Sequence, residues 1–328
     1  MFEQLNNIPR LLLEQELRPI QGDRFQPTGF ADLGAADYKL HDGRRMLLVE
    51  SAQSVANRLE KTCLAGDGPR IHPDLEGLSY VLAKLSGATE AETSSLVEAH
   101  RINSPFIVGN TQFAAEFLRR SGCQPGKPIV WNQIARTLFW FDVNALVHGA
   151  FMPNVDSRIR VPRAISGFIE ASDVMEAVSG GVKNNALDPT GKIRAKDFDE
   201  NVYSNVPYQR VEYTADRITA YFNLDLALIS GYGLPEPARE LLIALSLLKV
   251  RRFIASGLRL RTACDFAPAR EIEVKSPSTF GLPEETALLK KVQACIVACR
   301  KDGLFRSPPV TILDTEVVKK EDPPAKPR

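Results

Sequence analysis

One stretch constrains the fold of this chain more than any other. Residues 235–256 have a proline near their start and are apolar on nearly every side from Leu241 to Leu248, after which basic residues follow. Proline is favoured in the first turn of a helix, and a helix without a polar face has to be buried. The sequence therefore predicts a long helix at the centre of the molecule, covered by other layers of structure.

A hairpin and a helix are predicted next to each other nearer the N-terminus. Asp42-Gly43 supplies left-handed turn geometry between two strand-like arms over residues 38–49. Ser51 then suits the N-cap of a helix, because its hydroxyl can accept a hydrogen bond from a free backbone N–H. The apolar residues that follow have the spacing of one helix face: Ala52, Val55, Ala56, Leu59 and Cys63.

The remaining patterns mix strands and helices without regular alternation. We expect a helix or strand around 5–17, a short helix near 80–85, helices over 110–120 and 283–300, strands over 158–161, 258–261 and 310–317, and a long exposed loop or hairpin arm over 174–203. This irregular order favours an α+β fold, with a sheet covered by helices on one face. The charged, proline-rich residues 319–328 are expected to be disordered.

Composition excludes several classes of protein. No stretch has the glycine pattern of a phosphate loop or dinucleotide site, or a nucleophile elbow, so the chain is not visibly an NTPase, dehydrogenase or hydrolase. The five cysteines and four histidines have no metal-ligand spacing, and we expect reduced, mostly buried thiols and neither metal nor cofactor. No apolar run is long enough for a membrane span and no secretory signal is visible, so a cytoplasmic location is expected.

The net charge of +1 argues against a generic polyanion binder but leaves room for a local basic stripe. Arg259 and Arg261 alternate on one face of a predicted strand, where guanidinium groups could pair with phosphates. A solvated strand face paired with local acids is at least as good an interpretation. The same alternatives hold for Arg158, Arg160 and Arg163.

Aromatic residues that could stack on bases are Phe106, Trp131, Trp140, Phe151 and Tyr208, and most of them are expected in the core.

Residues 50–60, Glu-Ser-Ala-Gln-Ser-Val-Ala-Asn-Arg-Leu-Glu, resemble the S-x-Q-S-x-A-N-R-x-E stretch of the type I-U (also called I-G) Cas-seven family, which belongs to the RAMP superfamily. Residues 100–105, His-Arg-Ile-Asn-Ser-Pro, look like the H-R-I motif of that family. Residues 244–253 and 257–261 resemble its late helix and basic strand. These motifs recur in the expected order over residues 49–262.

The resemblance implies an RRM-like (ferredoxin-like) palm over residues 1–310, with a finger-like insertion at about 60–130 and a thumb-like arm at about 178–205. Residues 311–328 would form a final strand and a disordered tail. Several copies would assemble along one crRNA as the helical backbone of a DNA-targeting Cascade effector complex for antiviral defence. The implied partners are the crRNA, target DNA paired to the guide, further copies of the chain and other Cascade subunits.

The resemblance also implies a non-enzymatic RNA-binding site. Ser51, Gln53, Ser54, Asn57 and Arg58 would contact phosphate or the 2′-hydroxyl. Further candidates for RNA contact are His100, Arg101, Arg158, Arg160, Arg163, Arg251, Arg252, Arg259 and Arg261. Arg58→Ala is expected to weaken guide binding with little loss of folding. Two alternatives remain open: a RAMP-type, metal-independent endoribonuclease that processes crRNA with His100 or His41 as general acid or base, and a metabolic α+β enzyme.

Overall fold

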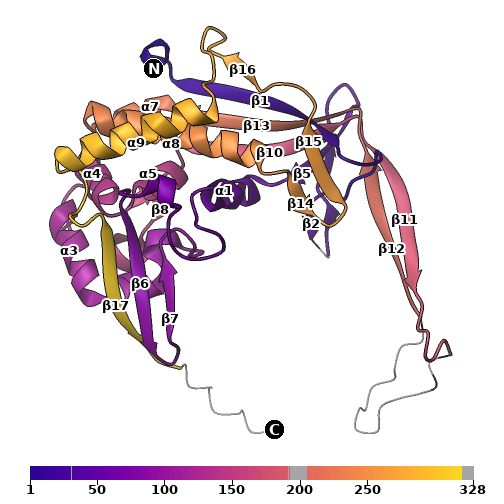
Figure 1. Ribbon diagram of the computed structural model, residues 1–328, viewed down its shortest axis with the longest axis horizontal. Helices are drawn as coiled ribbons and strands as arrows, with labels where there is room; N and C mark the ends of the chain where they lie inside the picture. Colours follow the sequence, from indigo (N-terminus) through magenta and orange to yellow (C-terminus); the bar gives the residue numbers. More distant parts are fainter. Residues whose placement is uncertain (31, 191, 193–204, 320–328) are drawn as a thin grey trace.

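The computed structural model describes residues 1–30, 32–190, 192 and 205–319. Its largest sheet is antiparallel, with the strand order β14-β15-β1-β13-β10-β5-β4 and with β16 paired to β1. In Figure 1 this curled sheet runs across the top of the molecule. Its strands are β1 (Arg10–Pro19), β4 (Asp37–Lys39), β5 (Arg45–Glu50), β10 (Ile165–Ser172), β13 (Arg217–Asp225), β14 (Arg259–Arg261), β15 (Cys264–Pro268) and β16 (Glu273–Ser276).

Helices cover one face of this sheet. Alternate residues of β10 and β13 are buried, as expected for strands that face a core on one side only. The covering helices are α1 (Ala52–Lys61), α7 (Leu226–Gly231), α8 (Glu236–Ala255) and α9 (Glu285–Lys301). In Figure 1, α1, α8 and α9 lie below the sheet. The α+β fold class with helices on one face is therefore confirmed.

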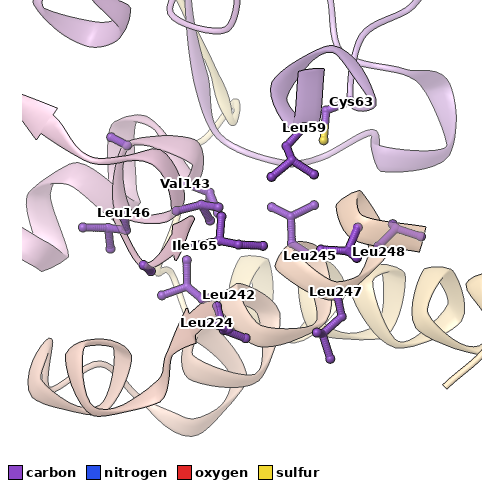
Figure 2. Packing of buried hydrophobic residues seen from close by; sticks show 14 of the residues in the cluster. Leu59, Cys63, Val143, Leu146, Ile165, Leu224, Leu242, Leu245, Leu247 and Leu248 are labelled. Carbon is purple, nitrogen blue, oxygen red and sulfur yellow. The ribbon is translucent and has the colours of Figure 1, made fainter. Parts of the chain in front are cut away.

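The helix predicted at the centre of the molecule is α8, and it is buried along most of its length. Figure 2 shows Leu245 of α8 near Leu59 of α1 and Ile165 of β10, with Leu242 and Leu248 of the same helix on either side of it. All five side chains are no more than 1% exposed. The helix has almost no polar face because sheet, α1 and α9 surround it.

A second group of elements packs beside the main sheet. It contains a three-stranded sheet of order β17-β6-β7, in which β17 runs parallel to β6. Its members are β6 (Tyr80–Gly87), β7 (Ala91–Ser94), β8 (Ala150–Phe151), β9 (Arg160–Val161), β17 (Val310–Val317), α2 (Pro105–Val108), α3 (Thr111–Ser121), α4 (Trp131–Phe141), α5 (Val143–His148), α6 (Pro153–Asp156) and the 3₁₀ helices η2 (Pro73–Leu75) and η3 (Arg101–Asn103). A third 3₁₀ helix, η1 (Glu3–Leu5), precedes β1.

The prediction of a short helix near residues 80–85 was wrong, because the strand β6 covers these residues. Its backbone groups are paired on both sides, with β17 and with β7. The partner β17 lies far away in the sequence, so local periodicity could not reveal the pairing. The helices expected over 110–120 and 283–300 and the final strand are confirmed as α3, α9 and β17.

A long hairpin leaves the main sheet at its right-hand end in Figure 1. It consists of β11 (Met175–Lys183) and β12 (Val206–Thr214), paired along their whole length. The hairpin arm expected in this region is confirmed for its described part, while residues 193–204 lie outside the described residues. A small sheet, β2 (Gly29–Phe30) with β3 (Gly34–Ala35), lies near its base.

The disorder expected over residues 319–328 falls, apart from residue 319, outside the described residues as well. Within the part of the chain that the structure describes, every helix is too short or too polar to cross a lipid bilayer.

Candidate nucleic-acid interface

The start of α1 has the predicted N-cap. Ser51 is extended, and its side chain accepts a hydrogen bond of 3.2 Å from the backbone N–H of Ser54. Val55, Ala56 and Leu59 are buried against the sheet, as the apolar spacing predicted. Ala52 is exposed instead, because the apolar stripe that contacts the sheet begins one turn later. The first turn is thus left open on its outer side.

Two amide side chains occupy that outer side. Gln53 and Asn57 are exposed one turn apart, and Gln53 Nε2 donates a hydrogen bond of 2.9 Å to Asn57 Oδ1. Arg163, which follows β9, donates from Nη2 to Gln53 Oε1 and from Nη1 to the Ala52 carbonyl at 3.4 Å. Three of the residues predicted to contact RNA, Gln53, Asn57 and Arg163, are therefore joined by hydrogen bonds.

A second arginine reaches the same helix face. Arg101, in η3, forms a two-fold ion pair with Glu60, with Nε–Oε1 at 2.5 Å and Nη2–Oε2 at 2.9 Å. Its backbone is left-handed, with φ at +50°, a conformation that is strained for a long side chain. Burial, and then the positive charge of Arg101, lower the pKa of Arg163. We call Gln53, Asn57, Glu60, Arg101 and Arg163 the α1 cluster; its net charge is +1.

The neighbouring surface is hollowed beside Arg101. A cavity of about 400 Å³ is lined by Ala99, His100, Arg101, Asn103, Pro105, Gly149, Ala150, Phe151, Pro153 and Asn154. His100 is exposed at its edge, whereas Asn103 is 6% exposed and its Oδ1 has no hydrogen bond within the described residues. Of the two predicted residues of the H-R-I motif, Arg101 therefore belongs to the α1 cluster and His100 borders the adjoining cavity.

The other flank of α1 surrounds a buried carboxylate. Glu50 is fully buried; Ser54 Oγ and Arg58 Nε donate to its Oε1, the latter at 3.0 Å, and Arg261 pairs with its Oε2. Arg58 also donates to the Leu260 carbonyl, and burial lowers its pKa. The expectation that Arg58→Ala costs little folding is therefore corrected, because Arg58 partners a buried charge.

Two other predicted arginines remain accessible. Arg160 is exposed and lies over the ring of Phe151, with its guanidinium carbon 4.5 Å from the ring centroid. Arg259 has a side chain that is 72% exposed, and its ion pair with Asp265 is 3.8 Å long. Arg160 borders the cavity through Phe151, while Arg259 lies on β14 beside the Glu50 flank.

Three predicted arginines are occupied by protein acceptors. Arg158 binds Asp156 at 2.6 Å and the carbonyls of Gln124 and Lys127 at 3.0 and 2.6 Å. Arg251 binds the carbonyls of Leu282 and Pro283, and Arg252 binds Asp74 and Glu285. These arginines connect loops and helices to one another, and the structure does not bring them to the α1 cluster.

A buried polar network, which the sequence analysis missed, lies near the α1 cluster. Lys249 Nζ is 2.5 Å from Asn144 Oδ1 and 2.7 Å from His148 Nε2, and all three residues are at most 3% exposed. The pKa of His148 is well below its ordinary value, first because of burial and then because of Lys249, Arg101 and Arg163. Burial raises the pKa of Asp142 to about 6. In the sequence, the one sign of this network was Lys249, a lysine within a largely apolar helix.

The expectation that most candidate aromatics lie in the core was wrong. Trp131, Phe151 and Tyr208 are 50%, 48% and 55% exposed, since each sits on an element edge or on the arm. All five cysteines are buried and unpaired, as predicted. Among the described residues, no group of three or more acidic, cysteine or histidine side chains could hold a metal.

Comparison with known proteins gives one family. Residues 11–176, just over half of the chain, match the model of the family described as CRISPR-associated protein GSU0053. This span holds α1, η3 and Arg163 and ends before β14. The CRISPR association implied by the sequence motifs is therefore confirmed.

Two solved structures are similar over most of the chain. A chain of "CRISPR RNA-guided surveillance complex, pre-nicking" has 12% identity and a TM-score of 0.42, covering 89% of this chain and 88% of that one. A chain of "CRISPR RNA-guided surveillance complex" has 11% identity and a TM-score of 0.31, with the same coverage. No curated protein sequence matches.

Proposed function

Because the chain belongs to the family of CRISPR-associated protein GSU0053, we propose that it is a non-enzymatic subunit that binds a guide RNA through the α1 cluster and the adjoining cavity. In this proposal several copies assemble along one crRNA as the backbone of a type I effector complex. Target DNA would pair with the bases of the guide, and other Cascade subunits would bind the ends.

One observation carries this proposal: Arg163 orients the exposed Gln53–Asn57 pair, with Arg101 beside it. Guanidinium groups pair with phosphate oxygens, and short amides can bond phosphate or the 2′-hydroxyl. Such contacts hold an RNA backbone without reading its sequence. The single carboxylate, Glu60, is already paired with Arg101, so it opposes an incoming phosphate only weakly.

The open face of the main sheet is a poorer candidate. It carries Glu14, Glu16 and Glu170. Arg217 pairs with Glu14 and Glu16, and Arg270 pairs with Glu16. Phe168 and Tyr221 stack on each other there, with centroids 5.1 Å apart. Carboxylates repel phosphate, so this face has aromatic rings but lacks the unpaired basic side chains that bind single strands as well. This contrast favours the α1 side.

We further propose that the palm is RRM-like. The order β15-β1-β13-β10, with α1 between β1 and β10 in the chain and α8 between β13 and β15, supports this. In this proposal β4 and β5 extend the palm at its edge. The elements between about residues 60 and 130 would be the finger-like insertion, and the β11–β12 hairpin would be the thumb-like arm.

The arm supports assembly with further copies. Large apolar side chains are exposed along it: Met175, Val178, Val182, Val206, Tyr208 and Val211. The strand register places Val178, Val182 and Val211 on one face of the hairpin and the other three on the opposite face. Exposed apolar side chains grouped in this way commonly mark a protein contact. The proposal assigns that contact to a neighbouring copy on the same guide.

One alternative has a specific observation in its favour. His100 is exposed at the edge of the cavity beside Arg101, where it could serve as general acid or base of a metal-independent endoribonuclease. Incubation with repeat RNA in EDTA separates the two functions. Site-specific cleavage that His100→Ala abolishes would establish the nuclease, whereas intact, bound RNA supports the binding subunit.

The guide-binding proposal itself is tested with the full chain and a crRNA. Arg163→Glu should weaken RNA binding about tenfold or more, since a charged hydrogen bond to phosphate is replaced by repulsion. Lys39→Glu, which makes the same charge change at an exposed residue of β4, is the matched control and should retain the wild-type affinity. Equal affinities of the two variants would refute the proposal.

A further inference from the structure

We propose that a second pocket, between α3 and α4, binds the phosphodiester backbone of single-stranded nucleic acid, with Trp131 as a stacking surface for a base. The pocket has a volume of about 620 Å³ and is lined by Arg119, Arg120, Val130, Asn132, Gln133, Arg136 and Thr137. None of these residues belongs to the α1 cluster, so the inference goes beyond the guide-binding proposal and stands or falls separately.

The charge of the pocket points to an anion. Three arginines line it, and no carboxylate does. Glu116 is 3.9 Å from Arg119 and acts on Arg120 as well, so it offsets one of the three positive charges. Within the described residues, Arg120 and Arg136 form no ion pair. An unneutralised set of guanidinium groups is the arrangement that binds phosphate.

Arg120 is held in place, yet its side chain forms no hydrogen bond within the part of the chain that the structure describes. Its guanidinium carbon lies 3.6 Å from the ring centroid of Trp140, and burial lowers its pKa. Its Nε is buried and has no hydrogen bond within the described residues. A buried, charged donor without an acceptor is costly, and an anion in the pocket would relieve that cost. This unpartnered donor is an independent indication that the pocket takes a ligand.

The surroundings of the pocket favour nucleic acid over an acidic protein segment. Trp131 lies between Val130 and Asn132, which both line the pocket, and it is half exposed. It also lines a neighbouring cavity of about 380 Å³ together with Arg160. Arg160 in turn lies over the exposed ring of Phe151. Alternating arginines and exposed aromatic rings fit a strand with phosphates and bases, whereas an acidic peptide has no use for the rings.

Intrinsic fluorescence provides a specific test, because both tryptophans of the chain belong to this region. Titration of the full-length protein with a single-stranded oligothymidylate of about 12 nucleotides should quench this fluorescence, since bases stack on exposed indole rings. Arg119→Glu combined with Arg136→Glu should weaken binding about tenfold or more and reduce its dependence on salt. Both arginines are exposed, so the fold should tolerate the change.

The control combines Lys39→Glu with Lys290→Glu, which makes the same charge change at two exposed lysines on other elements. Quenching that is equal in both double variants would overturn the proposal. So would poly-glutamate binding as tightly as the oligonucleotide, or inorganic phosphate at low millimolar concentration displacing it fully. In a parallel crRNA titration, the pocket variant should keep guide affinity, and Arg163→Glu should keep oligothymidylate quenching. Failure of one proposal is thereby distinguished from failure of the other.

Discussion

Arg58 Nε donates a hydrogen bond of 3.0 Å to Oε1 of Glu50, a carboxylate whose side chain is only 1% exposed. Arg261 pairs with the second oxygen of the same carboxylate. This joins α1 to β5 and β14 through one buried acid. A residue that the sequence motif assigns to RNA is thus also part of the fold.

Arg58→Ala should therefore destabilise the protein, by about 1–3 kcal/mol, because it leaves part of a buried carboxylate without its donor. Urea unfolding at neutral pH measures this loss. The double variant Arg58→Ala with Glu50→Gln should recover part of it, since the uncompensated charge is then removed as well. Wild-type stability of the single variant would show that the pair contributes nothing.

Gln53→Ala combined with Asn57→Ala should leave the stability of the fold almost unchanged and weaken guide binding. Both side chains are exposed and bond mainly to each other and to Arg163, so unfolding should change by no more than about 0.5 kcal/mol. Guide affinity should fall several-fold, because the two amide contacts proposed for the RNA backbone are lost. Filter binding with a crRNA measures the affinity. A stable double variant with full guide affinity would place the RNA elsewhere.

The close packing of α1 on β10 depends on Gly167. A Cβ at this position would lie 2.8 Å from Phe222 Cδ1, 2.8 Å from the Tyr221 carbonyl and 3.1 Å from Val55 Cγ1. Gly167→Ala should therefore cost about 1–3 kcal/mol, as overpacked cores do. Thermal melting measures the loss. Gly281→Ala, where the added methyl meets no atom within 4 Å, is the matched control and should melt like the wild type.

Local sequence patterns predicted those elements whose formation depends on neighbouring residues and not on a distant partner. The largely apolar helix α8, the Ser51 cap and the Asp42-Gly43 turn needed no distant information. The strand β6 was missed because its identity depends on β17.

The same reasoning applies to the candidate site. Arg252 was predicted to contact RNA but binds Asp74, 178 positions away, and Arg101 binds Glu60, 41 positions away. Side-chain pairing over such distances decides which charges remain free, and periodicity contains no information about it. The family resemblance therefore points to helix α1, while only the fold separates accessible arginines from occupied ones.

Two buried groups near the α1 cluster predict an unusual response of stability to acid. Unfolding restores the ordinary pKa of His148, near 6.5, from a folded value well below it, so His148 lowers stability as the pH falls below about 6.5. Asp142 has the opposite effect on stability. Its folded pKa of about 6 exceeds the unfolded value of 3.8, so it raises stability as the pH falls from about 6 to 3.8.

Asp142→Asn removes the compensating group while keeping an N-cap for α5. Between pH 6 and 4, its free energy of unfolding should fall more steeply than that of the wild type, by up to about 1.4 kcal/mol per pH unit. Urea unfolding at several pH values measures both slopes. Asp67→Asn, at an exposed position, controls for the change in net charge. Parallel curves for Asp142→Asn and wild type would mean that Asp142 titrates normally.

The apolar side chains of the β11–β12 arm predict a defect in assembly that spares the folded chain. Val178 is 76% exposed and lies opposite Val211, which is 41% exposed. Val178→Asp should leave melting and the affinity for a single-site RNA unchanged, because the side chain contacts solvent in the isolated chain. On a guide long enough for several copies it should block stacking, since a carboxylate would have to be buried against the neighbouring copy.

Sedimentation velocity of the protein–crRNA mixture measures the size of the assembly. The control is Asn184→Asp, which adds the same charge at an exposed polar position of the arm. Assemblies of wild-type size with Val178→Asp would assign the arm to another contact.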